Sequence, residues 1–356
     1  MMAASLVVKV IGAFFQIPLQ NLIGGEKSPA FGMFSAAYRI YTAMLVISTV
    51  GLPAALSKMV AEATARGREH EVRRIVRVAA GIFVPVGALC SLALFFGAGT
   101  FAAWIKSEDS RLAVMAIAPS VLMVAILSVF RGYYQGRSNM VPTAVSQVLE
   151  SLIKLFVGIA LALYFLKTTG LPELGAAGAI LGVSIGSFFA VLYILLYYFR
   201  KSRDTRYSPF EPKVSSVGEI LKSILTFAVP VIIGSAFLSA LDIVDSSVMM
   251  YRLQGAAGVD ANSAIAMKGW LGTARKYFDL PNAVIVPIST IVLPMLSGAI
   301  AKKEKREINR ISTLSLRMTL MVAIPSAAGL CIFAKPICSL LLYSRPEFAA
   351  NTAPLL

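Results

Sequence analysis

The chain has 356 residues, of which 57% are hydrophobic and only 14% are charged, and its formal net charge is +15. Soluble domains are nearer half apolar and a quarter charged. Here the apolar residues form long blocks, which excludes an ordinary soluble domain and predicts an all-α polytopic membrane protein. The basic residues lie in short segments between these blocks, which argues against nucleic-acid binding and favours loops on the cytoplasmic side of a membrane.

About nine segments approach the roughly 20 residues that a helix needs to cross a bilayer. In chain order we expect them at 3–22, 31–60, 76–98, 112–134, 142–167, 174–199, 220–249, 270–299 and 312–334. The segment 336–343 is expected to end the ninth helix or to form a short re-entrant piece. The chain stops at Leu356, where a tenth helix could begin.

The first expected helix carries Ser5, Lys9, Gly12, Gln16 and Gln20 at spacings of three and four, which places them on one face. A lysine near the bilayer centre costs roughly 2.5–3.5 kcal/mol. We therefore expect the face with Lys9 and Gln16 to line a cavity. The alternative for Lys9 is that its side chain extends to the cytoplasmic surface.

The second and fifth expected helices also carry charge. Arg39 lies about two turns from the outer end of the second helix, and extension to the outer surface is its alternative. The fifth helix opens at Pro142, as suits a first turn. Its Glu150 and Lys154 share a face with the acid four residues ahead, so they are either functional charges or a self-neutralising structural pair.

The later helices add glycines and further charge. The sixth has Gly175, Gly178, Gly182 and Gly186 about one turn apart, a pattern typical of close helix packing. On the seventh, Asp242 and Asp245 are candidates for binding a coupling cation or carrying a proton. Their alternative is pairing with Arg252 at the outer surface. Lys276 belongs to a charged group before Pro281, expected at the outer mouth of the eighth helix.

Loop charge predicts the orientation of the chain. The segments after even-numbered helices are rich in Lys and Arg, at 61–77, 131–137, 200–219 and 301–311, whereas those after odd-numbered helices are sparser or mixed. Positive loops stay in the cytoplasm. We therefore expect a multi-pass protein of the cytoplasmic membrane with its N-terminus in the cytoplasm.

A short internal repeat suggests two related halves. Residues 48–53 read STVGLP and residues 289–294 read STIVLP, each near the end of a long helix that leads to a basic loop. Because these are expected helices two and eight, the repeat unit is six helices, a recurring transporter plan. The expected division is an N-lobe at 1–200, a cytoplasmic linker at 201–219 and a partial C-lobe at 220–356.

Motifs for catalysis and metal binding are lacking. The single histidine, His70, lies in a basic segment, and the three cysteines are spread through apolar segments without metal-ligand spacing. No phosphate-binding loop or nucleophile elbow occurs in a usable setting. The sequence therefore predicts a protein that is not an enzyme and has no metal site or cofactor, although Na⁺, H⁺ or the membrane potential could drive it.

Several stretches resemble the multidrug/oligosaccharidyl-lipid/polysaccharide (MOP) flippases, in the branch of stage V sporulation protein B-like proteins and lipid II flippases. They are KVIGAFFQIPLQNLIG at 9–24, AAYRIYTAMLVISTVGLPAALSKMVAE at 36–62, RGYYQGRSNMVPTAVSQVLE at 131–150 and ARKYFDLPNAVIVPISTIVLP at 274–294. The resemblance implies a MATE-like transporter with two six-helix lobes, of which this chain would be a C-terminally truncated form.

The resemblance also implies a cationic cavity for a lipid diphosphate, with Lys9, Arg39 and Lys276 at the matching positions. Position 16 usually carries Arg in this branch and here is Gln16. Asp242 matches an acidic residue through which some relatives bind sodium. The expected substrate is a lipid-linked cell-wall or polysaccharide precursor, and cell-wall enzymes are expected partners. The alternatives are a cation-coupled multidrug exporter that uses Asp242 or Glu150, and a non-transporting scaffold for cell-wall or sporulation enzymes.

Overall fold

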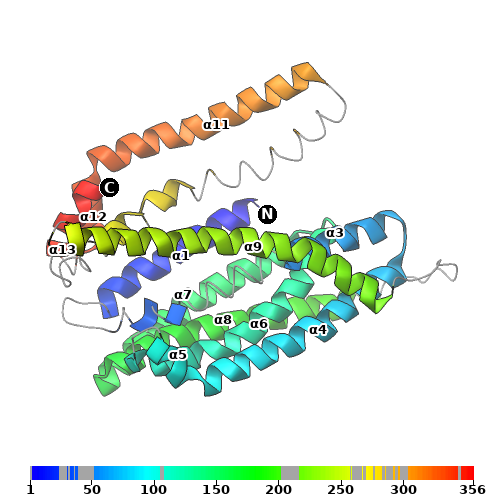
Figure 1. The fold of residues 1–356 in the computed structure, drawn as a ribbon, viewed down its shortest axis with the longest axis horizontal. Coiled ribbons are helices and arrows are strands. Elements are labelled where there is room, and N and C mark those ends of the chain that lie inside the picture. The colour runs from blue at the N-terminus through cyan, green and yellow to red at the C-terminus, as the bar shows by residue number, and fades with distance from the viewer. Residues whose placement is uncertain are drawn as a thin grey trace. The chain divides into compact units, whose positions relative to one another are not determined.

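The computed structural model in Figure 1 describes residues 2–23, 52–104, 108–201, 216–256, 304–343 and 346–356, with short pieces inside 30–38 and 258–296. Every regular element within these ranges is a helix. Five described helices are long and apolar enough to cross a membrane; they span Glu69–Phe96, Arg111–Gly136, Val141–Thr169, Pro172–Arg200 and Lys305–Ile332. The predicted all-α polytopic class is therefore confirmed.

The chain forms two compact units. The first consists of Leu22–Asp242 together with Met1, and the second of Met2–Asn21 and Ile243–Leu356. Most of the expected linker at 201–219 falls outside the described residues, so the division into lobes at this linker stays a prediction.

The first unit is a layered helical bundle (Figure 1). Its elements are α3 (Leu52–Ala65), α4 (Glu69–Phe96), α5 (Ala98–Trp104), η2 (Glu108–Ser110), α6 (Arg111–Gly136), α7 (Val141–Thr169), α8 (Pro172–Lys201) and the first part of α9 (Val217–Tyr251). Helix α7 packs on α8, α8 on α6 and α6 on α4, and α3 lies against α6 and α4. Helices α6, α7 and α8 match the expected spans to within a few residues.

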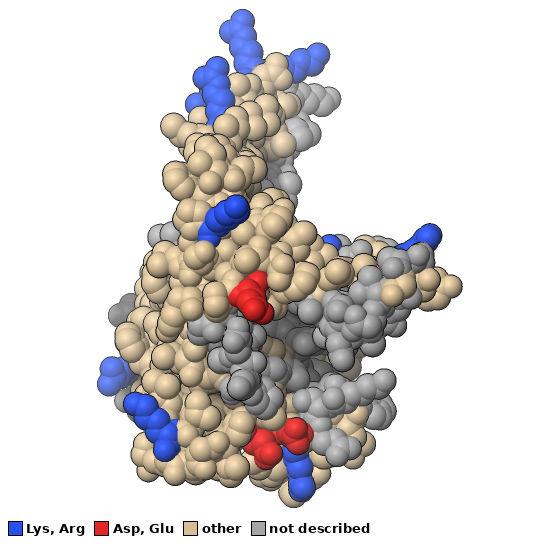
Figure 2. Space-filling view, turned by 90° about the vertical axis from the view of Figure 1, so that its left-hand side faces the viewer, with Lys and Arg blue, Asp and Glu red and all other residues tan. Residues whose placement is uncertain are grey.

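Burial separates the central helices from the peripheral ones. In the most apolar window of each helix, 56% of α6 and 50% of α8 are buried, against 17% of α4 and 22% of α7. The outer helices instead expose large apolar side chains, such as Phe96 on α4 and Phe156 on α7. Figure 2 shows a face whose coloured surface is mostly tan, with Lys and Arg side chains gathered mainly at its upper end and margins. Such extended apolar surface suits contact with lipid.

The connection between α3 and α4 is shorter than the sequence suggested. Helix α3 continues to Ala65, a turn with Gly67 at φ +70° follows, and α4 begins at Glu69. Arg73 therefore lies in the helix, as do Arg74 and Arg77, and the expected basic loop at 61–77 is mostly helical. Glu69 and Glu71 in the first turn of α4 favour this early start, because acidic groups stabilise a helix N-terminus.

The second unit contains most of α1 (Met2–Ile23), the end of α9, η4 (Arg252–Ala256), α11 (Lys305–Ile332), α12 (Ala334–Leu341), α13 (Pro346–Thr352) and η5 (Ala353–Leu355). Tyr277, Cys338, Leu342 and Ala349 form a small buried cluster. The segment 336–343, expected to end the ninth helix or to form a short re-entrant piece, belongs mostly to a separate short helix, α12. The Asn21 side-chain amide donates a hydrogen bond to the Leu341 carbonyl at 2.8 Å, which joins the end of α1 to α12.

Candidate functional site

The turn between α6 and α7 brings two charged helices together. Helix α6 ends at Gly136, and Ser138 takes the left-handed conformation with φ +57°. The Ser138 and Asn139 amides donate to the Gln135 and Tyr134 carbonyls at 3.0 Å, which satisfies the end of α6. Helix α7 then starts with Pro142 in its first turn, as the sequence predicted. This tight connection makes α6 and α7 neighbours and determines which side chains of the two helices come into contact.

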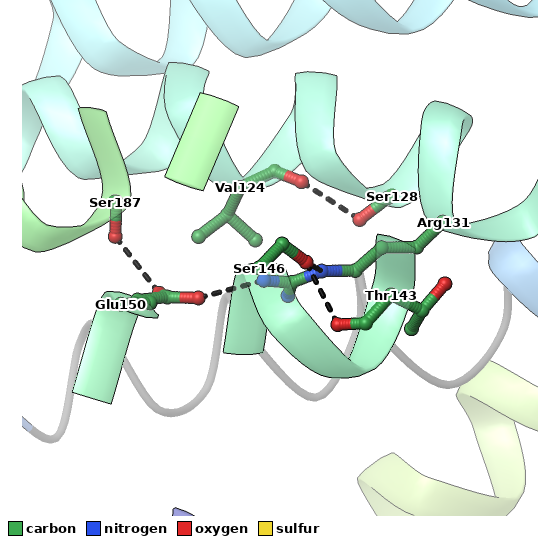
Figure 3. Close-up of polar contacts among 7 residues, drawn as sticks. All are labelled: Val124, Ser128, Arg131, Thr143, Ser146, Glu150 and Ser187. Atoms are coloured by element: carbon green, nitrogen blue, oxygen red, sulfur yellow. Dashed lines mark hydrogen bonds and ion pairs between the residues drawn. The ribbon is translucent and has the colours of Figure 1, made fainter. Parts of the chain in front are cut away.

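Arg131 and Glu150 form a buried ion pair across these two helices (Figure 3). The Nη2 atom of Arg131 lies 2.9 Å from Oε2 of Glu150, and the two side chains are 6% and 10% exposed. The distribution of Lys and Arg along the chain assigns Arg131 to a basic loop. The structure corrects this, because Arg131 is inside α6 and buried. Burying either charge alone would be expensive, and the pairing offsets that cost.

Two hydroxyl groups and one backbone carbonyl complete the site, which we call the Arg131–Glu150 network. Nε of Arg131 donates to Ser146 Oγ at 3.1 Å, and this hydroxyl donates to the Thr143 carbonyl at 2.8 Å. From α8, Ser187 Oγ donates to Oε1 of Glu150 at 2.9 Å. Both oxygens of the carboxylate are therefore hydrogen-bonded, and three helices are tied through one acid (Figure 3).

Glycines on α8 allow this approach. A Cβ on Gly182 would lie 2.2 Å from the Gly158 Cα on α7, and one on Gly186 would lie 2.7 Å from the Glu150 carbonyl oxygen. Side chains here would push α8 away from α7 and remove Ser187 from reach of Glu150. The predicted packing role of this glycine stripe is confirmed.

Lys154 lies one turn beyond Glu150, near the middle of α7. Its Nζ is 5.9 Å from the centroid of the Tyr38 ring, a cation–π geometry, and its side chain is half-buried. It also interacts through space with the Glu150 carboxylate. The ion pair of Glu150 is with Arg131, so a simple Glu150–Lys154 pair on one helix does not describe the site. Counted over these three described residues alone, two cations and one carboxylate carry one net positive charge.

A second cluster lies at the α6–α7 turn end of the bundle, and the sequence analysis missed it. Between the two helices, the ring centroids of Tyr133 and Tyr198 lie 5.4 Å apart and those of Tyr134 and Tyr197 lie 5.5 Å apart. Tyr193 extends the cluster along α8, with its ring centroid 6.2 Å from that of Tyr197. Arg137 caps it: its guanidinium lies 5.2 Å from the Tyr133 ring centroid and pairs with Glu69. Tyrosine gathers at membrane interfaces. The two YY pairs in the sequence, at 133–134 and 197–198, were the available signal.

The other predicted site residues are not brought into the network by the described part of the structure. Lys9 and Gln16 lie in α1 and Asp242 and Asp245 in α9, and the side chains of all four are outside the description. Arg39 and Lys276 lie outside the described residues altogether. Their roles stay predictions.

The helical fold defines a class of protein. The crystal structure of a MATE transporter in the straight conformation matches 99% of this chain and 75% of that chain, with a TM-score of 0.68 at 16% identity. The architecture is thus that of a MATE-like transporter. The profile of the family described as "Polysaccharide biosynthesis protein" matches residues 1–300. The chain belongs to this family, in the MOP superfamily, whose members are transporters and flippases rather than enzymes.

Three curated relatives come from Bacillus subtilis. The uncharacterised membrane protein YabM is 25% identical over 97% of this chain, stage V sporulation protein B is 27% identical over 94%, and the lipid II flippase MurJ is 20% identical over 96%. The chain spans 63%, 64% and 65% of the lengths of these relatives, respectively.

Proposed function

We propose that the protein moves a polyprenyl-diphosphate-linked glycan or peptidoglycan precursor across the cytoplasmic membrane by alternating access. The observation that carries the proposal is that two cations, Arg131 and Lys154, lie together with the carboxylate of Glu150 inside the described helical bundle. Charge inside a membrane protein is costly and usually serves function. A diphosphate group is a ligand that such an excess of positive charge would attract.

The same charges weigh against a multidrug exporter that uses Glu150 to attract cations. Both oxygens of the Glu150 carboxylate already accept hydrogen bonds, one of them from Arg131. A cationic drug would have to displace the guanidinium from a buried pair, which leaves one charge uncompensated. The names of the relatives, a lipid II flippase and a stage V sporulation protein, also support a lipid-linked substrate.

Lys154 is a proposed ligand of the diphosphate. The sequence proposes four more, whose side chains lie outside the description: Lys9, Gln16, Arg39 and Lys276. Asp242 and Asp245 are proposed to couple transport to Na⁺ or H⁺. The N-terminus is proposed to be cytoplasmic, so that the lipid headgroup enters from the side on which precursors are made. Cell-wall synthesis enzymes are the proposed protein partners.

Binding of a purified polyprenyl diphosphate to the intact protein in detergent tests the proposal. Lys9→Ala and Lys276→Ala should each weaken binding about tenfold or more, because a low-dielectric cavity strengthens contacts to phosphate. Gln16→Arg should tighten binding. The control is Lys222→Ala, which removes an exposed lysine at the start of α9.

Complementation in cells depleted of their own flippase separates transport from binding. Wild-type protein should restore growth, and Lys9→Ala and Lys276→Ala should not, at equal membrane insertion. Rescue by wild type without any binding of the diphosphate would instead favour a scaffold for cell-wall enzymes. Full rescue by both alanine variants would exclude these lysines as essential ligands.

A further inference from the structure

A cavity lies at the end of the first unit where α5, η2, α6 and α8 come together, at the opposite end of α6 from the α6–α7 turn (Figure 1). Its volume is about 780 Å³, within the range of about 300–1,000 Å³ that is common for small-molecule sites. The charged residues that line it are Asp109, Arg111 and Glu173. None of them belongs to the Arg131–Glu150 network, so this is a separate candidate site.

The cavity is expected at the level of the lipid headgroups. Arg111 is the first residue of α6 and Glu173 lies in the first turn of α8, and both helices are long and apolar enough to cross a membrane. Helix α6 has 26 residues, which at a rise of about 1.5 Å per residue exceeds the hydrocarbon core of about 30 Å. The charged start of α6 can therefore lie in the headgroup region.

The lining of the cavity changes from charged to apolar along α6. Arg111 is exposed at the start of the helix, Leu112 follows it, and Met115 lies one turn deeper. Helix α5 contributes Gly99 and Ala103, whose small size leaves the cavity open. A charged mouth beside an apolar wall at this level matches a phospholipid, which has a polar headgroup and apolar chains.

The charges of the cavity favour one kind of headgroup. A guanidinium binds phosphate well, and carboxylates accept hydrogen bonds from a primary ammonium. The described residues that line the cavity include no aromatic ring, the usual contact of a quaternary ammonium such as choline. We propose that the cavity binds the headgroup of an ethanolamine phospholipid, with Arg111 at the phosphate and Asp109 and Glu173 at the ammonium. This site goes beyond the proposed function and does not depend on which precursor is transported.

Native mass spectrometry of the intact protein in detergent tests the site, with ethanolamine and choline phospholipids that have the same acyl chains. Wild-type protein should bind the ethanolamine lipid about threefold more tightly or better, as expected for partly exposed ion pairs. Equal affinities for the two lipids would overturn the inference.

Substitutions of the two kinds of charge should have different effects. Arg111→Gln should weaken binding of both lipids, because both carry the phosphate. Asp109→Asn/Glu173→Gln should weaken binding of the ethanolamine lipid alone and so remove the preference for it. Arg77→Gln, which removes an exposed arginine of α4, is the control and should leave the preference unchanged. A carboxylate double variant that keeps the full preference would contradict the proposal.

A bulky residue at Gly99 tests the cavity without changing any charge. Gly99 is exposed, and a Cβ there would lie 3.9 Å from Nε of Arg111, an ordinary contact, so Gly99→Phe should fold and fill the cavity. Thr100→Phe, at the next exposed position of α5, is the matched control outside the described lining. The preference for the ethanolamine lipid should be lost in Gly99→Phe and kept in Thr100→Phe. A folded Gly99→Phe protein that keeps the preference would overturn the inference.

Competition by glycerophosphoethanolamine distinguishes a membrane lipid from a soluble headgroup. This compound carries the same phosphate and ammonium but has no acyl chains to pack on Leu112 and Met115. It should therefore bind at least about tenfold more weakly than the lipid. Equal affinity would show that the cavity takes a soluble zwitterion and would overturn the assignment to a phospholipid.

Discussion

Arg131 and Glu150 lie 19 residues apart in the chain and meet at 2.9 Å across the α6–α7 turn, almost fully buried. The pair lies within helices that are long and apolar enough to cross a membrane, and it ties α6, α7 and α8 together. Its contributions to stability and to ligand binding can be measured separately.

The first prediction concerns the stability of this pair. Removing one partner, as in Glu150→Leu, leaves a buried guanidinium without its carboxylate and should cost about 3–5 kcal/mol. Replacing both residues, as in Arg131→Met/Glu150→Leu, should be close to neutral because no charge is left buried. Unfolding of the purified protein in detergent measures both effects. A double variant as unstable as the single variant would contradict the prediction.

The second prediction concerns the hydroxyl from α8. Ser187→Ala removes a hydrogen bond to a buried carboxylate and should cost about 1.5–3 kcal/mol. Ser184→Ala on the same helix is the matched comparison, because Ser184 donates to the neutral carbonyl of Ala116. Ser184→Ala should therefore lower the free energy of unfolding by only about 1 kcal/mol. An equal decrease in the free energy of unfolding in the two variants would contradict the prediction. It would mean that the hydrogen bond from Ser187 to the Glu150 carboxylate stabilises the protein no more than a bond to a neutral carbonyl.

The third prediction concerns close packing of α7 and α8. Gly182→Val should destabilise the bundle by about 1–3 kcal/mol or more, because its Cβ would overlap the backbone at Gly158 and the two helices must separate. Gly81→Ala in α4 is the control, since a Cβ there meets nothing within 4 Å. In thermal unfolding, the Tm should be markedly lower for Gly182→Val and nearly unchanged for Gly81→Ala.

The fourth prediction concerns orientation. In a background without Cys90, Cys331 and Cys338, single cysteines at Ser107 and Ser202 are labelled with a membrane-impermeant reagent on intact cells. Cys90 and Cys331 are exposed, so their removal is necessary. The Lys/Arg distribution predicts labelling at 107 and protection at 202. Labelling at 202 with protection at 107 would show that the chain has the opposite orientation and would contradict the prediction.

Helical periodicity was sufficient to predict much of the local structure. The first turn of α7 at Pro142 and the glycine stripe of α8 followed from the sequence. Periodicity compares residues on one helix, however, and it therefore paired Glu150 with Lys154. The contact with Arg131 depends on how α6 and α7 lean together, which the turn at Ser138 and the packing of α8 determine.

One sequence signal for that contact was available. Arg131 lies inside the expected span 112–134, and an arginine within a membrane helix requires a buried partner. Glu150 was the nearest acidic residue on an adjacent span. The early start of α4 had a comparable signal, since Glu69 and Glu71 are typical of a helix N-terminus. In both cases the charged residues lie at the end of an apolar block, where apolar length alone predicts a loop.

The bond from Asn21 to the Leu341 carbonyl constrains how the chain crosses the membrane. Asn21 lies near the end of α1, and Leu341 ends the short helix that follows α11. Two atoms in contact must be on the same side of the bilayer, so the chain between them has to cross it an even number of times. The spans expected from 31–60 to 312–334 satisfy this parity rule. Any revised topology with one span added or removed in that interval would separate the two residues by the full thickness of the membrane.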